Sequence, residues 1–433
     1  MTLQEHIRKH VTLATPVVVG QLGHIMVSVA DTAMVGRVGV IPLAGATFAG
    51  TIYHIMMLFG IGISYAITPL VAASKPDDRD QHIHLLQHAF LLNLSLGVLF
   101  FLLMVACYPL LPYMGQETLV VDAAGPFLVI IGSSIIPLMV FQTFRQYAEG
   151  LSNTFLPMIV SVIANLVNVG LNWVLIFGKM GAPALGLNGA GYATLISRIL
   201  MAAAMWVIIR NISLFKKYDW STIKRMLKLG IPSGLQYVFE VGAFAVSTIM
   251  MGWISAEAMA AHQIALNLSA ISYMAATGIA AAATVRVGNQ LGLKDKSNLR
   301  LAGITSVGLV TVFMSFAAAV FILFNHELVS LYIKEADVQS LAANLLLIAA
   351  AFQISDGIQA VGLGMLRGLT DVKVPTIVTF IAYWLIAIPL GYVLAFKIGW
   401  QAQGIWIALL TGLSIAAAMH MFRFFSKIKR INF

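Results

Sequence analysis

The sequence predicts an all-α polytopic membrane protein, with twelve transmembrane helices arranged as two similar six-helix lobes. Three observations lead to this fold class. The 433 residues are 60% hydrophobic and only 10% charged, so the chain has too little polar surface to coat a soluble globule of this size. Apolar runs of spanning length recur along the whole chain. The two halves also share short motifs in the same order.

Each apolar run is long enough to cross a bilayer as a helix, which takes about 20 residues. The first follows a short basic lead and is too long for a cleavable signal peptide, so we interpret it as a retained span. We expect the spans at residues 11–35, 44–73, 84–109, 123–147, 156–178, 188–210, 227–253, 258–288, 299–326, 339–367, 373–396 and 402–423.

Positive charge is distributed unequally over the loops between these runs. When the connections are assigned alternately to two sides, most of the 26 Lys and Arg residues fall on the side that holds both termini. The opposite side has Arg37, Lys179, Lys334 and Lys397, and Arg198 lies within the sixth span. This bias predicts cytoplasmic termini and an even number of spans. Because the basic residues form no continuous face, the net charge of +9 does not indicate a nucleic-acid partner.

An internal repeat divides the chain. Leu13-Ala-Thr-Pro16 is matched by Leu229-Gly-Ile-Pro232, and Gly150-Leu-Ser-Asn153 by Gly368-Leu-Thr-Asp371, at nearly one offset. We therefore expect an N-lobe at residues 1–210, a cytoplasmic linker at 211–226 and a C-lobe at 227–433. An even number of spans per repeat makes the two lobes parallel, and a substrate cavity is expected between them.

The sequence does not contain the common motifs of ATPases or hydrolases. The chain contains no Gly-Lys-Ser/Thr phosphate loop, no His-Glu-x-x-His and no nucleophile elbow, and its one cysteine, Cys107, lies in an apolar run. We therefore expect neither ATP-driven transport nor catalysis, and no cofactor.

Two carboxylates lie deep within predicted spans. Glu240 is near the middle of the seventh span, and Asp356 has no charged neighbour in sequence between Asp337 and Arg367. A carboxylate at membrane depth costs at least about 2.5 kcal/mol, so each should face a polar cavity. Together the two could offer hard oxygens to Na⁺, or mutual repulsion could keep a proton on one of them. The sequence leaves both routes of ion coupling open.

A second polar group is predicted in the first half of the chain. Asp31 lies near the end of the first span, and Asn165, Asn168 and Asn172 lie in the fifth. Asn168 and Asn172 are four residues apart and so share a helix face, and Thr194 in the sixth span joins the group. Asn residues also bridge membrane helices without any transport role, so a structural function is the alternative.

These residues carry a family likeness that covers nearly the whole chain. The chain resembles the multidrug and toxin extrusion (MATE) transporters, in particular their NorM-like branch. The likeness rests on the Glu240 span and on four stretches: the first span with Pro16 and the ending Val29-Ala-Asp31-Thr-Ala-Met-Val-Gly36, Arg145-Gln-Tyr-Ala-Glu-Gly-Leu-Ser-Asn153, Ala261-His-Gln263, and Gln353-Ile-Ser-Asp356.

The resemblance implies a V-shaped, two-lobed carrier of the MATE/MOP type. Such a carrier sits in the bacterial inner membrane and exports organic, often cationic or amphipathic, compounds against Na⁺ or H⁺ entry by alternating access. The implied roles are cation coupling for Glu240, Asp356 and Asp31, and a bend in the first helix at Pro16. The residues implied to line the cavity are Gln263, Tyr273, Asn165, Asn168, Asn172 and Thr194.

Two points depart from this expectation or compete with it. Relatives of the NorM type carry a tyrosine four residues before the tenth-span carboxylate, where this chain has Phe352, so one oxygen ligand is missing. The competing function is a flippase for a lipid-linked precursor, whose cavity should contain several basic residues to hold a pyrophosphate. The span interiors here contain carboxylates and mainly Arg198, which favours cation export. We expect a monomer.

Overall fold

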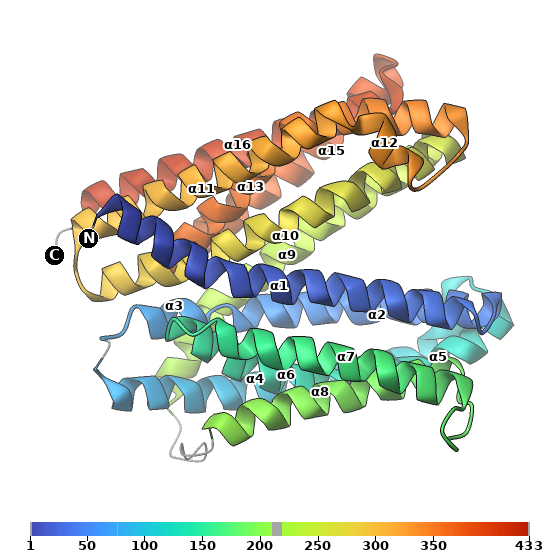
Figure 1. Ribbon diagram of the computed structural model, residues 1–433, viewed down its shortest axis with the longest axis horizontal. Helices are drawn as coiled ribbons and strands as arrows, with labels where there is room; N and C mark the ends of the chain where they lie inside the picture. Colours follow the sequence, from blue (N-terminus) through green and yellow to red (C-terminus); the bar gives the residue numbers. More distant parts are fainter. Residues whose placement is uncertain (1, 76, 210–218, 432–433) are drawn as a thin grey trace. The chain divides into compact units, whose positions relative to one another are not determined.

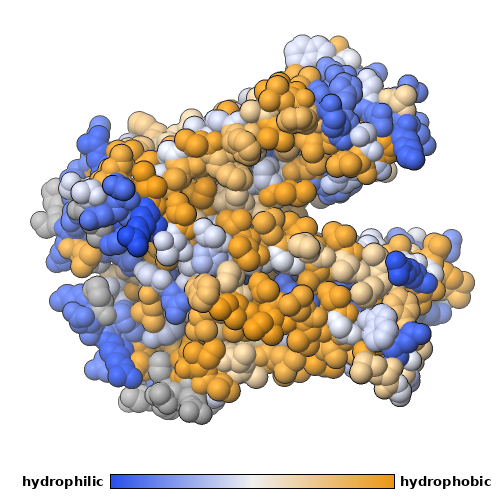
Figure 2. Space-filling view, viewed as in Figure 1, coloured by the Kyte–Doolittle hydropathy of each residue, from blue (hydrophilic) through white to orange (hydrophobic). Residues whose placement is uncertain are grey.

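A computed structural model describes residues 2–75, 77–209 and 219–431, and every regular element within these ranges is a helix (Figure 1). Twelve of the helical segments are long and apolar enough to cross a membrane, which confirms the predicted fold class. Hydrophobic side chains cover the middle of the molecule and hydrophilic ones gather at the helix ends (Figure 2), as a bilayer-embedded protein requires.

The first six spans follow the predicted order. They are formed by α1 (Leu3–Gly36), α2 (Val40–Ser64) with α3 (Ile67–Ala72), α4 (Arg79–Cys107) with the 3₁₀ turn η1 (Tyr108–Met114), α5 (Thr118–Ser133) with α6 (Ile135–Gly150), α7 (Phe155–Phe177) and α8 (Leu187–Ile209).

The last six spans include one irregular span, the eleventh. The regular ones are α9 (Trp220–Ile254), α10 (Ala256–Gly292), α11 (Lys296–Leu323), which the short α12 (Asn325–Ser330) follows, α13 (Ala336–Gly368) and α16 (Gln401–Arg430). The eleventh span consists of four consecutive elements: α14 (Lys373–Phe380), η2 (Ile381–Ala387), α15 (Ile388–Tyr392) and η3 (Val393–Lys397).

Proline explains where several spans are interrupted. A proline inside a helix removes one backbone hydrogen bond and crowds the carbonyl four residues earlier. The second span breaks at Tyr65–Ala66 ahead of Pro69, and the fourth breaks at Ser134 ahead of Pro137. In the eleventh span the π-helical turns of η2 come directly before Pro389.

Side-chain caps fix several helix starts. Asp78 accepts from the Gln81 amide at 3.0 Å at the start of α4, and Ser255 accepts from the Ala258 amide at 3.0 Å at the start of α10. Asp219 accepts from the amides of Ser221 and Thr222 at 3.0 and 3.1 Å, so α9 begins at Trp220. The expected linker 211–226 is therefore helical over its last residues, and residues 211–218 lie outside the described part of the chain.

The chain forms two compact units whose borders lie inside helices. One unit comprises residues 19–234, and the other joins residues 1–18 to residues 235–433. The chain thus passes between the units within α1, two residues after Pro16, and within α9, two residues after Pro232. These borders differ from the lobe limits expected at 210 and 227, because the first turns of α1 pack with the C-terminal unit and the first turns of α9 pack with the N-terminal unit. His10 donates or accepts a 2.7 Å hydrogen bond with Ser306 there.

Small residues let helices approach closely within each unit. In the C-terminal unit, a Cβ added at Gly364 of α13 would lie 2.3 Å from the Ala280 carbonyl oxygen of α10, and one at Gly368 would lie 2.7 Å from the Thr284 oxygen. In the N-terminal unit, a Cβ at Gly62 would lie 2.5 Å from the Cα atom of Gly234. Membrane helices associate through such small-residue contacts, since lipid supplies no hydrophobic drive between them.

Candidate functional site

The C-terminal unit brings two buried carboxyl groups into electrostatic contact. Glu240 of α9 is 7% exposed and Asp356 of α13 is 5% exposed, and the Glu240 carboxyl group acts electrostatically on that of Asp356. The Tyr273 hydroxyl of α10 donates to Glu240 Oε1 over 3.2 Å. The structure therefore brings the two candidate coupling residues, Glu240 and Asp356, together with Tyr273, which was expected in the cavity lining, and the three come from different helices.

Polar atoms without partners surround this pair of carboxyl groups. Tyr383 is fully buried in the eleventh span, interacts electrostatically with both Glu240 and Asp356, and its hydroxyl has no hydrogen-bond partner in the described part of the chain. Gln353 lies one turn before Asp356, and its amide nitrogen is also unpaired, although its oxygen accepts from Ser272 at 2.7 Å. Unpaired buried polar groups cost about 1–3 kcal/mol each, which a ligand entering the site would relieve.

The donor chemistry of this site fits a small hard cation better than a transition metal. No three His, Cys, Asp or Glu side chains within the described ranges gather into one group. Two carboxylates with neutral hydroxyl and amide oxygens are the ligands that hard cations take. A proton shared between the carboxyl groups satisfies the same arrangement, since two adjacent buried carboxylates do not both ionise easily.

Phe352, which offers no oxygen to a cation, lies with its ring buried among other aromatic side chains. Its centroid lies 5.5 Å from the ring of Trp406 and 6.1 Å from Phe244. Tyr383, whose ring lies 6.1 Å from Phe244, brings a hydroxyl to the carboxyl pair from a different helix. Sequence reasoning missed Tyr383; the signal available was a tyrosine in the middle of an otherwise apolar eleventh span.

One cation lies beside the carboxyl pair. Arg367, at the end of α13, interacts electrostatically with Glu240, donates to Gln236 Oε1 over 3.4 Å and covers the Tyr237 ring at 5.3 Å. These contacts attach Arg367 to the turn of α9 that precedes Glu240. The last turn of α13 is thereby connected to the helix that carries the first carboxylate.

In the N-terminal unit, Asp31 lies in a chain of amide side chains. Asn172 Nδ2 of α7 donates to Asp31 Oδ1 over 2.5 Å and to Asn168 Oδ1 over 3.0 Å. Asn172 is fully buried and Asn168 is 5% exposed. The expected shared face of Asn168 and Asn172 is thus present, and it is turned toward Asp31.

The other two residues predicted for this group are placed differently. Thr194 donates to the Ala190 carbonyl of its own helix at 3.1 Å, a local bond that is common for membrane threonines. Asn165 lies against α1 further along, since a Cβ added at Gly23 would be 3.4 Å from its amide nitrogen. Neither residue has a hydrogen bond to Asp31 among the described residues.

Arg198 is a member of this neighbourhood that the predicted site did not include. It interacts electrostatically with Asp31, its Nη1 donates to Ser134 Oγ at 2.6 Å and to the Tyr53 hydroxyl, and its guanidinium lies over the Tyr53 ring at 5.2 Å. The signal in the sequence was its place as the basic residue inside the sixth span. The polar centre of the N-terminal unit therefore contains both signs of charge.

On α10, a pair of exposed amide side chains and a buried histidine lie on different faces of the helix. Gln263 Nε2 donates to Asn267 Oδ1 over 3.3 Å, and both residues are exposed. His262 is fully buried, accepts from Trp406 Nε1 at 3.0 Å through Nδ1 and pairs with Thr248 through Nε2 at 3.2 Å. Both ring nitrogens of His262 therefore have hydrogen-bond partners, on α16 and α9. These contacts between helices are what a structural role for His262 predicts.

Comparison with known proteins assigns the family. The family model described as MatE matches residues 16–174 and again residues 232–393. A protein from Mesorhizobium japonicum, named "Probable multidrug resistance protein NorM", is 34% identical over 97% of this chain and 94% of its own length. This chain belongs to the MatE family.

The two matches of the MatE model begin at Pro16 and Pro232, which are equivalent positions of the internal repeat in the sequence. A further MatE relative, from Yersinia pseudotuberculosis and named "Multidrug resistance protein MdtK", is 34% identical over 96% of this chain and 94% of its own.

Solved structures share the MatE fold. The structure titled "Outward-facing conformation of a multidrug resistance MATE family transporter of the MOP superfamily" superposes with a TM-score of 0.90 at 17% identity, over 98% of this chain and 96% of that one. The eukaryotic MATE transporter AtDTX14 gives a TM-score of 0.86 at 20% identity, over 99% of this chain and 97% of that one.

Proposed function

We propose that this MatE-family protein is a secondary active exporter that moves organic, often cationic and amphipathic, compounds out of the cell against Na⁺ or H⁺ entry. The observation that carries the proposal is the buried pair of Glu240 and Asp356 among unpaired polar groups. Relatives at 34% identity over nearly the whole chain are named multidrug resistance proteins, which supports this class of substrate. The carrier works without a cofactor.

Competition for the carboxyl pair provides the coupling. A cationic substrate or the coupling ion can neutralise Glu240 and Asp356, but the second to arrive gains little because the charge is already compensated. Binding of the ion therefore weakens substrate binding, and by linkage the substrate weakens ion binding to the same degree. The downhill ion, entering from outside, then drives release of the substrate.

The candidate ligands of the coupling ion come from four helices. With Na⁺, the carboxylates of Glu240 and Asp356 are joined by the hydroxyl of Tyr383 or Tyr273, and Phe352 contributes no oxygen. With H⁺, the same carboxyl groups hold the proton and the tyrosines orient them. Asp31, held by Asn172, is the further candidate for proton coupling, and Pro16 is the place where the first helix would bend.

The substrate path is proposed to include Gln263 in the C-terminal unit and Asn168 and Asn172 in the N-terminal unit. Gln263 is exposed on α10, where it is accessible to a substrate, and it is preorganised by Asn267. Thr194 and Asn165 are secondary candidates because their present contacts are local or directed to α1.

The bias of basic residues supports a place in the bacterial inner membrane with both termini in the cytoplasm. We propose that the protein works as a monomer, since each of its two units already contains a complete polar centre. Flipping of a lipid-linked pyrophosphate has no observation in its favour: the buried pair at the centre of the C-terminal unit is acidic.

The test is efflux of a fluorescent organic cation from proteoliposomes, run once with only an inward Na⁺ gradient and once with only an inward proton gradient. Glu240→Gln and Asp356→Asn should each abolish gradient-driven efflux, whereas Asp122→Asn, which removes an exposed carboxylate of α5, should leave it intact. Wild-type efflux in both site variants would refute the coupling role. No efflux by the wild-type protein under either gradient would refute the antiport function itself.

A further inference from the structure

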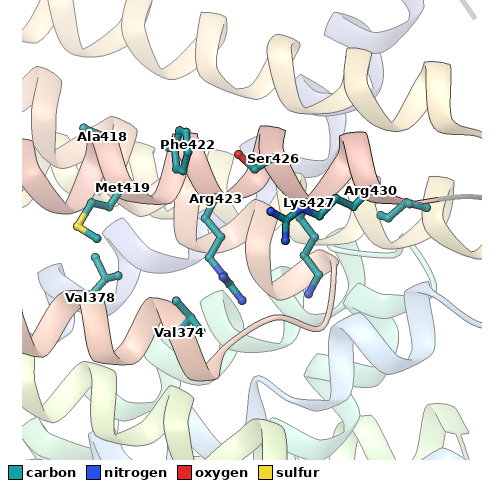
Figure 3. A pocket seen from close by; sticks show the side chains of 10 residues that line it. Val374, Val378, Ala418, Met419, Phe422, Arg423, Ser426, Lys427 and Arg430 are labelled. Carbon is teal, nitrogen blue, oxygen red and sulfur yellow. The ribbon is translucent and has the colours of Figure 1, made fainter.

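A groove lies between α14 and the last turns of α16, within the C-terminal unit and apart from the carboxyl pair (Figure 3). Its cavity volume is about 790 Å³. One part of the lining is apolar and the other is cationic. This combination has no role in the proposed transport cycle.

The apolar part is formed by a partly buried and a buried valine of α14 and by two exposed side chains of α16. Val374 and Val378 are one turn apart on α14, and Met419 and Phe422 are one turn apart on α16. Met419 is 45% exposed and Phe422 is 77% exposed. Exposed apolar side chains on a membrane-spanning helix are exposed to lipid chains rather than to water.

The cationic part continues the same face of α16 toward the chain end. Arg423, Lys427 and Arg430 are spaced by four and three residues, so they follow Met419 along one side of the helix. The step from Arg423 to Arg430 covers about 10 Å at 1.5 Å per residue. The lining of the groove thus changes from apolar to cationic side chains along α16, over a distance of about the depth of a lipid headgroup and its glycerol.

One buried carboxylate orients two of these cations without balancing all three. Asp371, 7% exposed, accepts from Arg423 Nε at 2.8 Å and Nη2 at 3.1 Å, and its Oδ2 lies 3.0 Å from Lys427 Nζ. Arg430 is exposed and has no ion pair among the described residues. The groove therefore retains an excess of two positive charges, and Asp371 holds Arg423 and Lys427 in place.

We propose that this groove binds one anionic phospholipid of the cytoplasmic leaflet. The acyl chain lies against Val378, Met419 and Phe422, and the phosphate is held by Lys427 and Arg430. Basic pockets beside transmembrane helices on the cytoplasmic side are suited to anionic headgroups, and each nearby Lys or Arg strengthens binding by about fivefold. A zwitterionic headgroup would bring a further cation into a groove that already carries excess positive charge.

The leaflet assignment rests on the proposed orientation of the termini, whereas the binding site itself does not depend on the transport function. Binding can therefore be measured on the full chain in detergent without any transport assay. Native mass spectrometry should detect phosphatidylglycerol bound at least about tenfold more tightly than phosphatidylcholine with the same acyl chains.

The decisive variant is Lys427→Gln/Arg430→Gln, which leaves the two hydrogen bonds between Arg423 and Asp371 intact. It should weaken phosphatidylglycerol binding by at least about tenfold. The matched control is Lys334→Gln/Lys397→Gln, which removes the same charge from exposed residues that do not line the groove, Lys397 being at the opposite end of the eleventh span from Val374, and it should bind like the wild type. Should the double variant fold poorly, Arg430→Gln alone, at an exposed position, should still weaken binding severalfold.

Three results would overturn the proposal. They are unchanged phosphatidylglycerol binding in both groove variants, an equal loss in the Lys334/Lys397 control, and displacement of the lipid by inorganic phosphate at the concentration of the lipid. The last result would identify a headgroup-only anion site rather than a phospholipid site.

Discussion

Replacing Gly364 with Ala tests whether the approach of α10 to α13 is as close as described. The added Cβ would lie 2.3 Å from the Ala280 oxygen and 3.0 Å from the Ala280 Cα atom. Both are backbone atoms, so no side chain can rotate out of the way. Relief requires the two helices to move apart by about 1 Å, since unbonded heavy atoms rest near 3.5 Å.

The cost follows from three contributions. Overpacking against backbone should reach the upper end of the usual range, about 3 kcal/mol. Separation of the helices also weakens the 2.9 Å bond from Thr284 Oγ1 to the Gly364 oxygen, a loss of about 0.6 kcal/mol for an interhelical bond in a membrane protein. The better helix propensity of Ala returns about 1 kcal/mol. The free energy of unfolding should therefore fall by about 2–3 kcal/mol.

Denaturant titration of the purified protein in mixed micelles, followed by tryptophan fluorescence, measures this change. The matched control is Gly308→Ala on α11, where an added Cβ meets nothing within 4 Å. It should leave stability unchanged or raise it by up to about 1 kcal/mol. If Gly364→Ala unfolds at the same denaturant concentration as Gly308→Ala, the helices are not in backbone contact and the reasoning is wrong.

Three further changes probe other contacts by the same titration. Trp406→Phe keeps the aromatic stack but leaves the buried His262 Nδ1 without its donor, so stability should fall by about 1–3 kcal/mol; a wild-type midpoint would contradict the pairing. The Asn298 backbone amide lowers the pKa of Asp295, which caps α11, so this stabilisation is present above about pH 4 and is lost as pH falls further. Asp295→Ala should cost about 1 kcal/mol at pH 7 and less at pH 3; an equal cost at both values would refute the charge effect. Arg198→Gln should destabilise more than Arg198→Lys, which retains the charge beside Asp31, and the reverse order would count against a stabilising role of this partly buried cation.

The helices could be predicted from the sequence because hydrocarbon imposes a simple rule on length and polarity. Each predicted span corresponds to a helix, and the carboxylates of spans seven and ten meet because a charge at membrane depth must find a polar site. The pairing of Asn168 with Asn172 followed from helical periodicity alone.

The remaining features depend on which helix lies beside which, and no local pattern encodes that. Tyr383 reaches the carboxyl pair from the eleventh span, and Arg198 reaches Tyr53 from the sixth, through packing between distant segments. Thr194 was expected in the Asp31 group but bonds to its own helix, a choice that depends on a side-chain rotamer. The early start of α9 depended on recognising Asp219 as a cap beyond the apolar run.

The two crossings of the chain between its compact units have a mechanical consequence. A helix bends most easily where its backbone hydrogen bonding is interrupted. Here both covalent joints lie in helices, two residues after Pro16 and Pro232, where the missing backbone hydrogen bond makes bending cheapest. The repeat that duplicated the fold thereby also duplicated the proline before each crossing, so both helices have an interrupted backbone hydrogen bond close to the point where the chain enters the other unit.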